Sequence, residues 1–197
     1  GRPLRATAER ITRLVEHDWG TRLIRSWDEQ WMELPLRLGD RIGEVCLGAA
    51  PDQTVVGDST TVMLYKLLRA AVAAAGPERP EIVLDTENFP TDRYVAEGIA
   101  AETGARLVWV EPDPAKGVTP DLVTDALTER TGVVLLSHVA YKSAWVADLP
   151  EITRLAHAAG QGAGALSTSP ASAGSLAHIP FCKRARAPSV RYGRWSE

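Results

Sequence analysis

The feature that most constrains the fold is an alternation of short apolar segments with longer segments of helical periodicity, from about residue 54 to residue 159. Strands are expected at Thr54–Val56, Glu81–Asp85, Arg106–Val110 and Gly132–Val139. Helices are expected at Thr61–Ala75, at Thr91–Thr103, from Thr119-Pro120 onward, and at Leu149–Ala159. Strands that alternate with helices form a parallel sheet covered on both faces, so the predicted fold class is α/β.

Residues 1–50 are expected to form an N-terminal helical segment that precedes an α/β part at residues 51–160. One amphipathic helix is expected at about Pro3–Asp18, and a second at about Leu36–Leu47. Leu4, Ile11, Leu14 and Val15 mark one face of the first. In the helix Thr61–Ala75 the expected buried face consists of Leu64, Leu67, Leu68, Ala71 and Val72.

The composition changes near residue 160. Residues 161–180 contain no Asp, Glu, Lys or Arg, and residues 181–197 carry five basic residues against one acidic residue. No strand is expected after residue 160, and residues 161–197 are expected to be disordered. A frame shift in the coding sequence would explain the change; a basic tail that contacts nucleic acid or an acidic membrane is the alternative.

Whole-chain features exclude several classes of protein. With 45% hydrophobic residues and a net charge of -3 the chain is not disordered throughout, and it contains no run of about 18 apolar residues that would span a membrane. The chain starts at Gly1 without a charged and apolar leader, so we expect no signal peptide and a processed product, an excised piece or an incomplete reading frame.

Three polar segments lie at or just after the ends of expected strands, and ligands bind at the carboxyl ends of strands in open parallel sheets. Residues 57–61 (Gly-Asp-Ser-Thr-Thr) suit a phosphate at a helix N-terminus or simple capping by Ser59 or Thr60. In residues 88–92 (Asn-Phe-Pro-Thr-Asp), Phe89 either presents its face to a planar ligand or packs onto a helix that Thr91 or Asp92 caps. Residues 137–143 (Ser-His-Val-Ala-Tyr-Lys-Ser) suggest a polar site.

These segments, in this order, resemble the kynureninase family, together with Arg22–Trp27, Trp31 and residues 85–94. The resemblance covers about residues 1–160 and implies the large domain of a type I pyridoxal-phosphate-dependent transferase fold, here partial. It implies that Thr60 and Thr61 contact the cofactor phosphate and that Phe89 stacks on the pyridine ring. Pro90, Thr91 and Asp92 would shape that wall, and Ser137 would lie beside the cofactor.

The resemblance also implies an activity. Kynureninases use pyridoxal 5'-phosphate to hydrolyse L-kynurenine or 3-hydroxykynurenine to anthranilate or 3-hydroxyanthranilate and L-alanine, in tryptophan catabolism and NAD biosynthesis. It implies a cytoplasmic homodimer that acts on a small molecule, with no metal, nucleic acid or membrane involved.

The chain departs from the family where the catalytic groups are expected. No aspartate follows Asp148 to pair with the pyridine nitrogen, and Lys183 is not preceded by the tyrosine that accompanies the Schiff-base lysine. The pairs Tyr65-Lys66 and Tyr141-Lys142 match other parts of the family, so no catalytic residue is assigned and this chain alone is expected to be inactive. The alternatives are a fragment of another type I enzyme, such as a cysteine desulfurase, in which histidine usually stacks on the ring, and a non-enzymatic protein that interacts through its basic tail.

Overall fold

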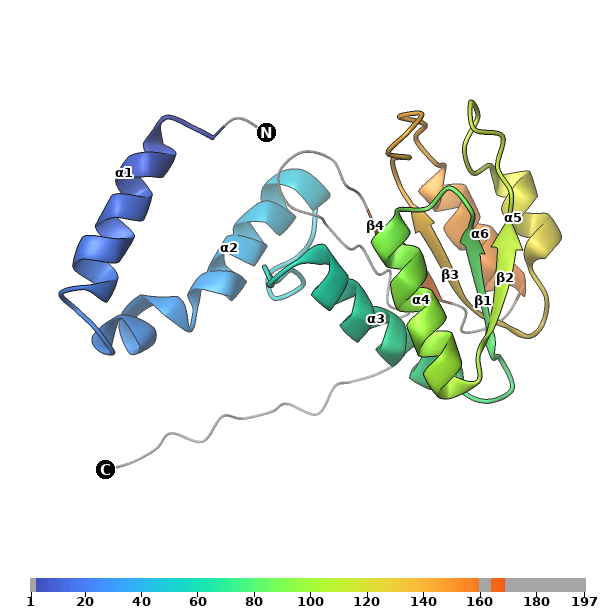
Figure 1. The fold of residues 1–197 in the computed structure, drawn as a ribbon, viewed down its shortest axis with the longest axis horizontal. Coiled ribbons are helices and arrows are strands. Elements are labelled where there is room, and N and C mark those ends of the chain that lie inside the picture. The colour runs from blue at the N-terminus through green and yellow to red at the C-terminus, as the bar shows by residue number, and fades with distance from the viewer. Residues whose placement is uncertain (1–2, 160–163, 169–197) are drawn as a thin grey trace. The chain divides into compact units, whose positions relative to one another are not determined.

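The computed structural model describes residues 3–159 and 164–168 (Figure 1). The chain divides into two compact units, Gly1–Ser59 and Thr60–Glu197. Within the described residues, no helix combines the length and the apolar character needed to cross a membrane. The basic segment at residues 181–197 and the glycine that was expected to end the last helix, Gly160, lie outside the described residues.

The first unit is helical. Its helices are α1 (Ala6–Arg13), the π-helical turns η1 (Leu14–Trp19) and η2 (Trp27–Trp31), α2 (Leu34–Ile42), and the π-helical turn η3 (Gly43–Leu47). The predicted strand Thr54–Val56 is wrong, because these residues have no strand neighbour. The Val56 amide donates to the carbonyl oxygen of Pro35 at 3.1 Å, and Thr54 packs so closely on Gly39 that a Cβ there would lie 2.1 Å from the Thr54 carbonyl oxygen.

The second unit is a parallel sheet with helices on both faces, which confirms the α/β class. Its strands are β1 (Glu81–Asp85), β2 (Arg106–Val110), β3 (Thr131–Ser137) and β4 (Gly164–Thr168), in the order β2-β1-β3-β4. Its helices are α3 (Thr60–Ala75), α4 (Pro90–Thr103), α5 (Pro120–Ala126) and α6 (Leu149–Ala159). α5 begins where expected, with Thr119 as its N-cap: the Leu122 amide donates to the Thr119 hydroxyl at 3.3 Å.

Alternating side chains of β1 and β3 build a core on each face of the sheet. Ile82, Leu84, Val133 and Leu135 pack with α3 and α4, whereas Val83, Val134 and Leu136 pack with α5 and α6. Figure 1 shows the two pairs of helices on opposite sides of the strands. The expected face of α3 is confirmed, since Leu64 and Leu68 are buried and Leu67, Ala71 and Val72 pack against the same cluster.

The expectation that no strand follows residue 160 is wrong. The backbone of β4 pairs in parallel with β3, from Val133 opposite Gly164 to Ser137 opposite Thr168. The sequence Gly-Ala-Leu-Ser-Thr contains few residues that favour a strand. Backbone pairing with the neighbouring strand stabilises the extended conformation that these side chains alone do not favour. β3 itself ends two residues before its predicted end, because Val139 leaves the sheet and pairs with Val146 in an antiparallel bridge.

Candidate functional site

The candidate site lies where β1 and β3 end side by side. The two strands are paired in parallel up to Leu84 opposite Leu135, so their last residues, Asp85 and Ser137, lie at one edge of the sheet. The loop before α4 follows β1, and a hairpin-like segment at residues 138–147 follows β3. In an open parallel sheet this carboxyl edge is the place where ligands bind.

Asn88, which is 1% exposed, joins the two loops. Its Oδ1 accepts hydrogen bonds from the Ser137 hydroxyl at 3.0 Å and from the Phe89 amide at 2.8 Å. Its Nδ2 donates to the carbonyl oxygen of Leu135 at 3.5 Å. Two of the predicted site residues, Phe89 and Ser137, are therefore fixed to the same buried side chain.

The predicted wall segment Phe89–Asp92 forms the start of α4. Phe89 is the N-cap residue with ψ 134°, the extended conformation that a following proline favours, and Pro90 occupies the first turn. The expectation that Thr91 or Asp92 caps the helix is wrong, because both lie inside it and Asp92 is buried. The Phe89 ring is 38% exposed and packs edge-to-face on Tyr141, with ring centroids 5.2 Å apart.

Thr60 and Thr61 are the first two residues of α3. The last residue of α3, Ala75, lies against Gly132 at the start of β3, since a Cβ on Gly132 would be 2.7 Å from that of Ala75. A 16-residue helix rises about 24 Å, and a 7-residue strand about 23 Å. Running back from Ala75 beside β3, α3 therefore has its first turn, with Thr60 and Thr61, towards the carboxyl end of the sheet, where Ser137 lies.

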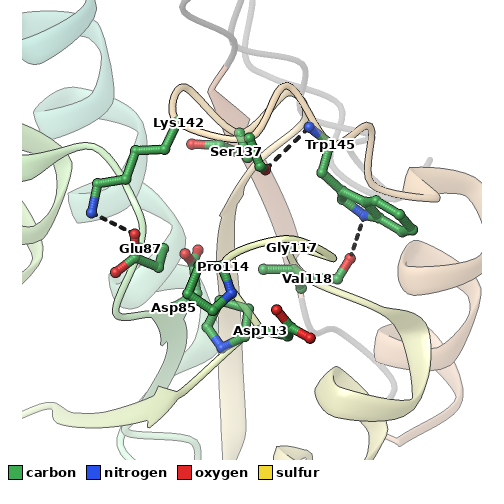
Figure 2. A pocket seen from close by; sticks show the side chains of 12 residues that line it. Asp85, Glu87, Asp113, Pro114, Gly117, Val118, Ser137, Lys142 and Trp145 are labelled. Atoms are coloured by element: carbon green, nitrogen blue, oxygen red, sulfur yellow. Dashed lines mark hydrogen bonds and ion pairs between the residues drawn. The ribbon is translucent and has the colours of Figure 1, made fainter.

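A small pocket lies beside this edge, with a volume of about 20 Å³, enough for about one water molecule. It is lined by Asp85, Glu87, Pro112, Asp113, Pro114, Gly117, Val118, Ser137, Ala140, Lys142, Ser143 and Trp145 (Figure 2). Of the predicted site residues only Ser137 lines it. The described residues contain no group of three or more His, Cys, Asp or Glu side chains placed to hold a metal ion.

Asp85 is the feature that the sequence reasoning missed. Its side chain is 4% exposed, and its Oδ2 has no hydrogen-bond partner among the described residues. Burial raises the pKa of this carboxyl group to about 6, with a smaller contribution from the Glu87 charge. A charged residue that ends an otherwise apolar strand, Glu-Ile-Val-Leu-Asp, is the sequence signal that points to it.

Lys142 is paired with Glu87 on one side of the pocket, as Figure 2 shows. The hydrogen bond from this lysine to Glu87 raises the pKa of its ammonium group. A raised pKa keeps this lysine in its protonated, weakly nucleophilic form over a wider pH range.

Trp145 closes the opposite side. Its indole N–H donates to the carbonyl oxygen of Val118 at 3.2 Å. Its ring lies over Gly117, where a Cβ would be 2.6 Å from Trp145 Cδ1. Gly117 has a φ of 59°, so both its backbone conformation and this close approach require glycine.

The family model for aminotransferase class V matches residues 42–166, and the chain belongs to this family. Among curated proteins it is 39% identical over 165 residues to kynureninase from Pseudomonas fluorescens, covering 81% of this chain and 38% of that protein. It is 37% identical to kynureninase from Burkholderia mallei, covering 79% of this chain and 37% of that protein. The resemblance to kynureninases is thereby confirmed; the chain spans less than two fifths of the length of these relatives.

Solved structures agree on the fold. A NifS-like protein matches with a TM-score of 0.72 at 11% identity, over 87% of this chain and 47% of that chain. A mutant of C-DES with glycine linked to its pyridoxal-phosphate cofactor matches with a TM-score of 0.59 at 18% identity, over 82% of this chain and 41% of that chain. At this identity these matches show a common fold, the partial large domain expected from the sequence, and with the family they confirm pyridoxal phosphate as the expected cofactor.

Proposed function

We propose that this chain carries the phosphate-binding and ring-stacking part of a kynureninase. The whole enzyme would hydrolyse the Cβ–Cγ bond of L-kynurenine or 3-hydroxykynurenine, giving anthranilate or 3-hydroxyanthranilate and L-alanine. The observation that carries the proposal is the arrangement of Phe89 and Ser137 around Asn88 at the sheet edge. A phenylalanine at this position also favours a kynureninase over a cysteine desulfurase, because the latter usually has histidine there.

The described residues suit a phosphorylated planar ring. The first turn of α3 offers backbone N–H groups and the hydroxyls of Thr60 and Thr61, and a helix N-terminus attracts a phosphate. Phe89 is partly exposed and offers an apolar ring surface, with Pro90, Thr91 and Asp92 forming the helix start beside it. Ser137 offers a hydroxyl whose direction is set by Asn88. When bound, pyridoxal phosphate supplies an electron sink for the carbanion at the substrate α-carbon.

Binding of the cofactor's ring and phosphate can be tested without turnover. Pyridoxine 5'-phosphate keeps both groups but lacks the aldehyde that reacts with lysines, so calorimetric titration measures this site alone. We expect the double variant Thr60→Ala/Thr61→Ala and the variant Phe89→Leu each to weaken binding about 5-fold or more. Thr124→Ala, an exposed threonine of α5, is the matched control and should bind as the unaltered chain does. A chain that does not bind this probe would contradict the proposal.

We propose further that the activity is that of a cytoplasmic homodimer and that this chain alone does not turn over kynurenine. None of its lysines stands, after a tyrosine, where the family resemblance places the Schiff-base lysine. Incubation with pyridoxal phosphate and kynurenine should therefore give no anthranilate fluorescence above that of a heat-denatured sample. Sustained formation of anthranilate would contradict this part of the proposal.

A further inference from the structure

Tyr141 lies against the ring that the proposed function assigns to cofactor stacking. The two ring planes of Phe89 and Tyr141 make an angle of 77°, with centroids 5.2 Å apart, so the edge of one ring meets the face of the other. Tyr141 thus covers at most one face of Phe89, which keeps 38% of its surface exposed. The exposed part of Phe89 is the surface that a planar ligand would contact.

The backbone of Phe89 is already fixed, and its side-chain torsions are what remain free. Its amide donates to Asn88 Oδ1 at 2.8 Å, and Pro90 restricts its backbone to the extended region. A half-exposed ring on such a backbone still has several rotamers available. Contact with Tyr141 favours the rotamer seen in the structure, since edge-to-face aromatic pairs attract beyond their buried area.

Tyr141 is itself held by the neighbouring ion pair. The ammonium group of Lys142 lies over the Tyr141 ring, 5.7 Å from its centroid, and Lys142 is paired with Glu87 in the loop that leads to Phe89. The hairpin-like segment is closed by hydrogen bonds of 2.9 Å from the Ala140 amide to the Trp145 carbonyl oxygen and from the Ala144 amide to the Ala140 carbonyl oxygen. Tyr141 therefore sits on a closed turn that is tied to the Phe89 loop.

We propose that Tyr141 is a positioning residue that orients the Phe89 ring for stacking on a planar, phosphorylated pyridine ring. This inference rests on the proposed function, because it needs Phe89 to face the cofactor. Tyr141 acts through Phe89 by its ring, and its hydroxyl group is not required. Without Tyr141, ordering of the Phe89 ring would oppose ligand binding.

The experiment is a titration of four chains with pyridoxine 5'-phosphate: the unaltered chain, Tyr141→Leu, Tyr141→Phe and Tyr94→Leu. Tyr94, which is 64% exposed on α4, is the matched control. We expect Tyr141→Leu to weaken binding about 3- to 10-fold, the range for an aromatic pair. Tyr141→Phe should bind as the unaltered chain does, because it keeps the ring, and so should Tyr94→Leu.

A second pair of titrations separates positioning from a general loss of structure. In a Phe89→Leu background, Tyr141→Leu should have no further effect on affinity, because there is no ring left to orient. Equal affinities of the unaltered chain and Tyr141→Leu, or an undiminished effect of Tyr141→Leu in the Phe89→Leu background, would overturn the role of Tyr141 and leave the proposed function intact. No binding by the unaltered chain would overturn the proposed function and this inference with it.

Discussion

The hydroxyl group of Ser137 donates a hydrogen bond to Asn88 Oδ1, 3.0 Å away, and so joins the end of β3 to the loop that follows β1. Asn88 is the only asparagine in the chain and is 1% exposed. Its carboxamide also bonds the Phe89 amide and the Leu135 carbonyl oxygen. One buried amide group thus sets the relative positions of the proposed ring-stacking side chain and the hydroxyl group beside it.

Replacing Asn88 by alanine leaves these groups without their partner. We expect Asn88→Ala to lower the free energy of unfolding by about 1–3 kcal/mol, the cost of buried polar groups left unpaired. Urea denaturation measures this change, and Gln53→Ala, an exposed amide, is the control. Ser137→Ala should cost less, and the double variant should cost less than the sum of the two. Additive losses would contradict a direct coupling between the two side chains.

Asp85 predicts an unusual dependence of stability on pH. Its pKa is about 6 in the folded chain against 3.8 for an ordinary aspartate, so between these values the folded state binds more protons than the unfolded one. The free energy of unfolding therefore falls as the pH rises from 4 through 6, by roughly 3 kcal/mol at most. Asp85→Asn should be more stable than the unaltered chain at pH 7.5, with the difference shrinking towards pH 4.

Thermal unfolding at a series of pH values measures this effect. Asp125→Asn, on the exposed face of α5, is the control and should melt within a degree or two of the unaltered chain at pH 7.5. If Asp85→Asn proved less stable than the unaltered chain at pH 7.5, the carboxylate would have a partner in solution that the described residues do not show.

Glu81, at the opposite edge of the sheet, has the reverse dependence. Burial acts to raise its pKa, but hydrogen bonds from Thr128 at 2.7 Å and Arg106 at 2.6 Å outweigh it and hold the pKa below the ordinary 4.5. A lowered pKa means that the stabilisation is present above pH 4.5 and is lost as the pH falls through the folded value. Glu81→Gln should cost about 1–3 kcal/mol at pH 7 and progressively less below pH 4.

The chain provides a matched surface pair for this test. Glu102 is 53% exposed and pairs with Arg69, so Glu102→Gln should change the free energy of unfolding by less than about 1 kcal/mol. The comparison is made by urea denaturation at pH 7 and at pH 3.5. Equal effects of the two substitutions at pH 7 would show that burial of Glu81 does not strengthen its interactions.

Segments with a clear hydrophobic pattern were predictable from the sequence, and those that depend on a neighbour were not. β1 and β2 have their predicted bounds, because each is a five-residue run with apolar side chains on both faces, and this pattern predicts a strand of a parallel sheet. All three residues of Thr54–Val56 are β-branched, which favours a strand, but they have no strand to pair with. β4 has few β-branched residues and nevertheless pairs with β3. Strand pairing depends on segments that are distant in the sequence, so the local sequence pattern led to a wrong prediction for both segments.

The candidate site divides in the same way. Phe89 follows a strand and Ser137 lies at the end of one, so both were assigned to the carboxyl edge of the sheet, where the structure joins them through Asn88. The burial of Asp85 and the pairing of Glu87 with Lys142, 55 residues away, depend on how two loops meet. The local sequence marks Asp85 only as a charged residue at the end of a strand, and it does not show which residues of the other loop lie beside it.

Ala144 gives a prediction about the turn that bears Tyr141 and Lys142. Its φ is 57°, in the left-handed region that costs a residue with a Cβ about 1–2 kcal/mol. Ala144→Gly removes this strain but makes the unfolded chain more flexible, so we expect a net gain of up to about 1 kcal/mol in the free energy of unfolding. Ala73→Gly, on an exposed position inside α3, should instead cost about 1 kcal/mol. Urea denaturation of the two variants should therefore move the midpoint in opposite directions, and a loss of stability in both would show that the turn does not hold Ala144 in this conformation.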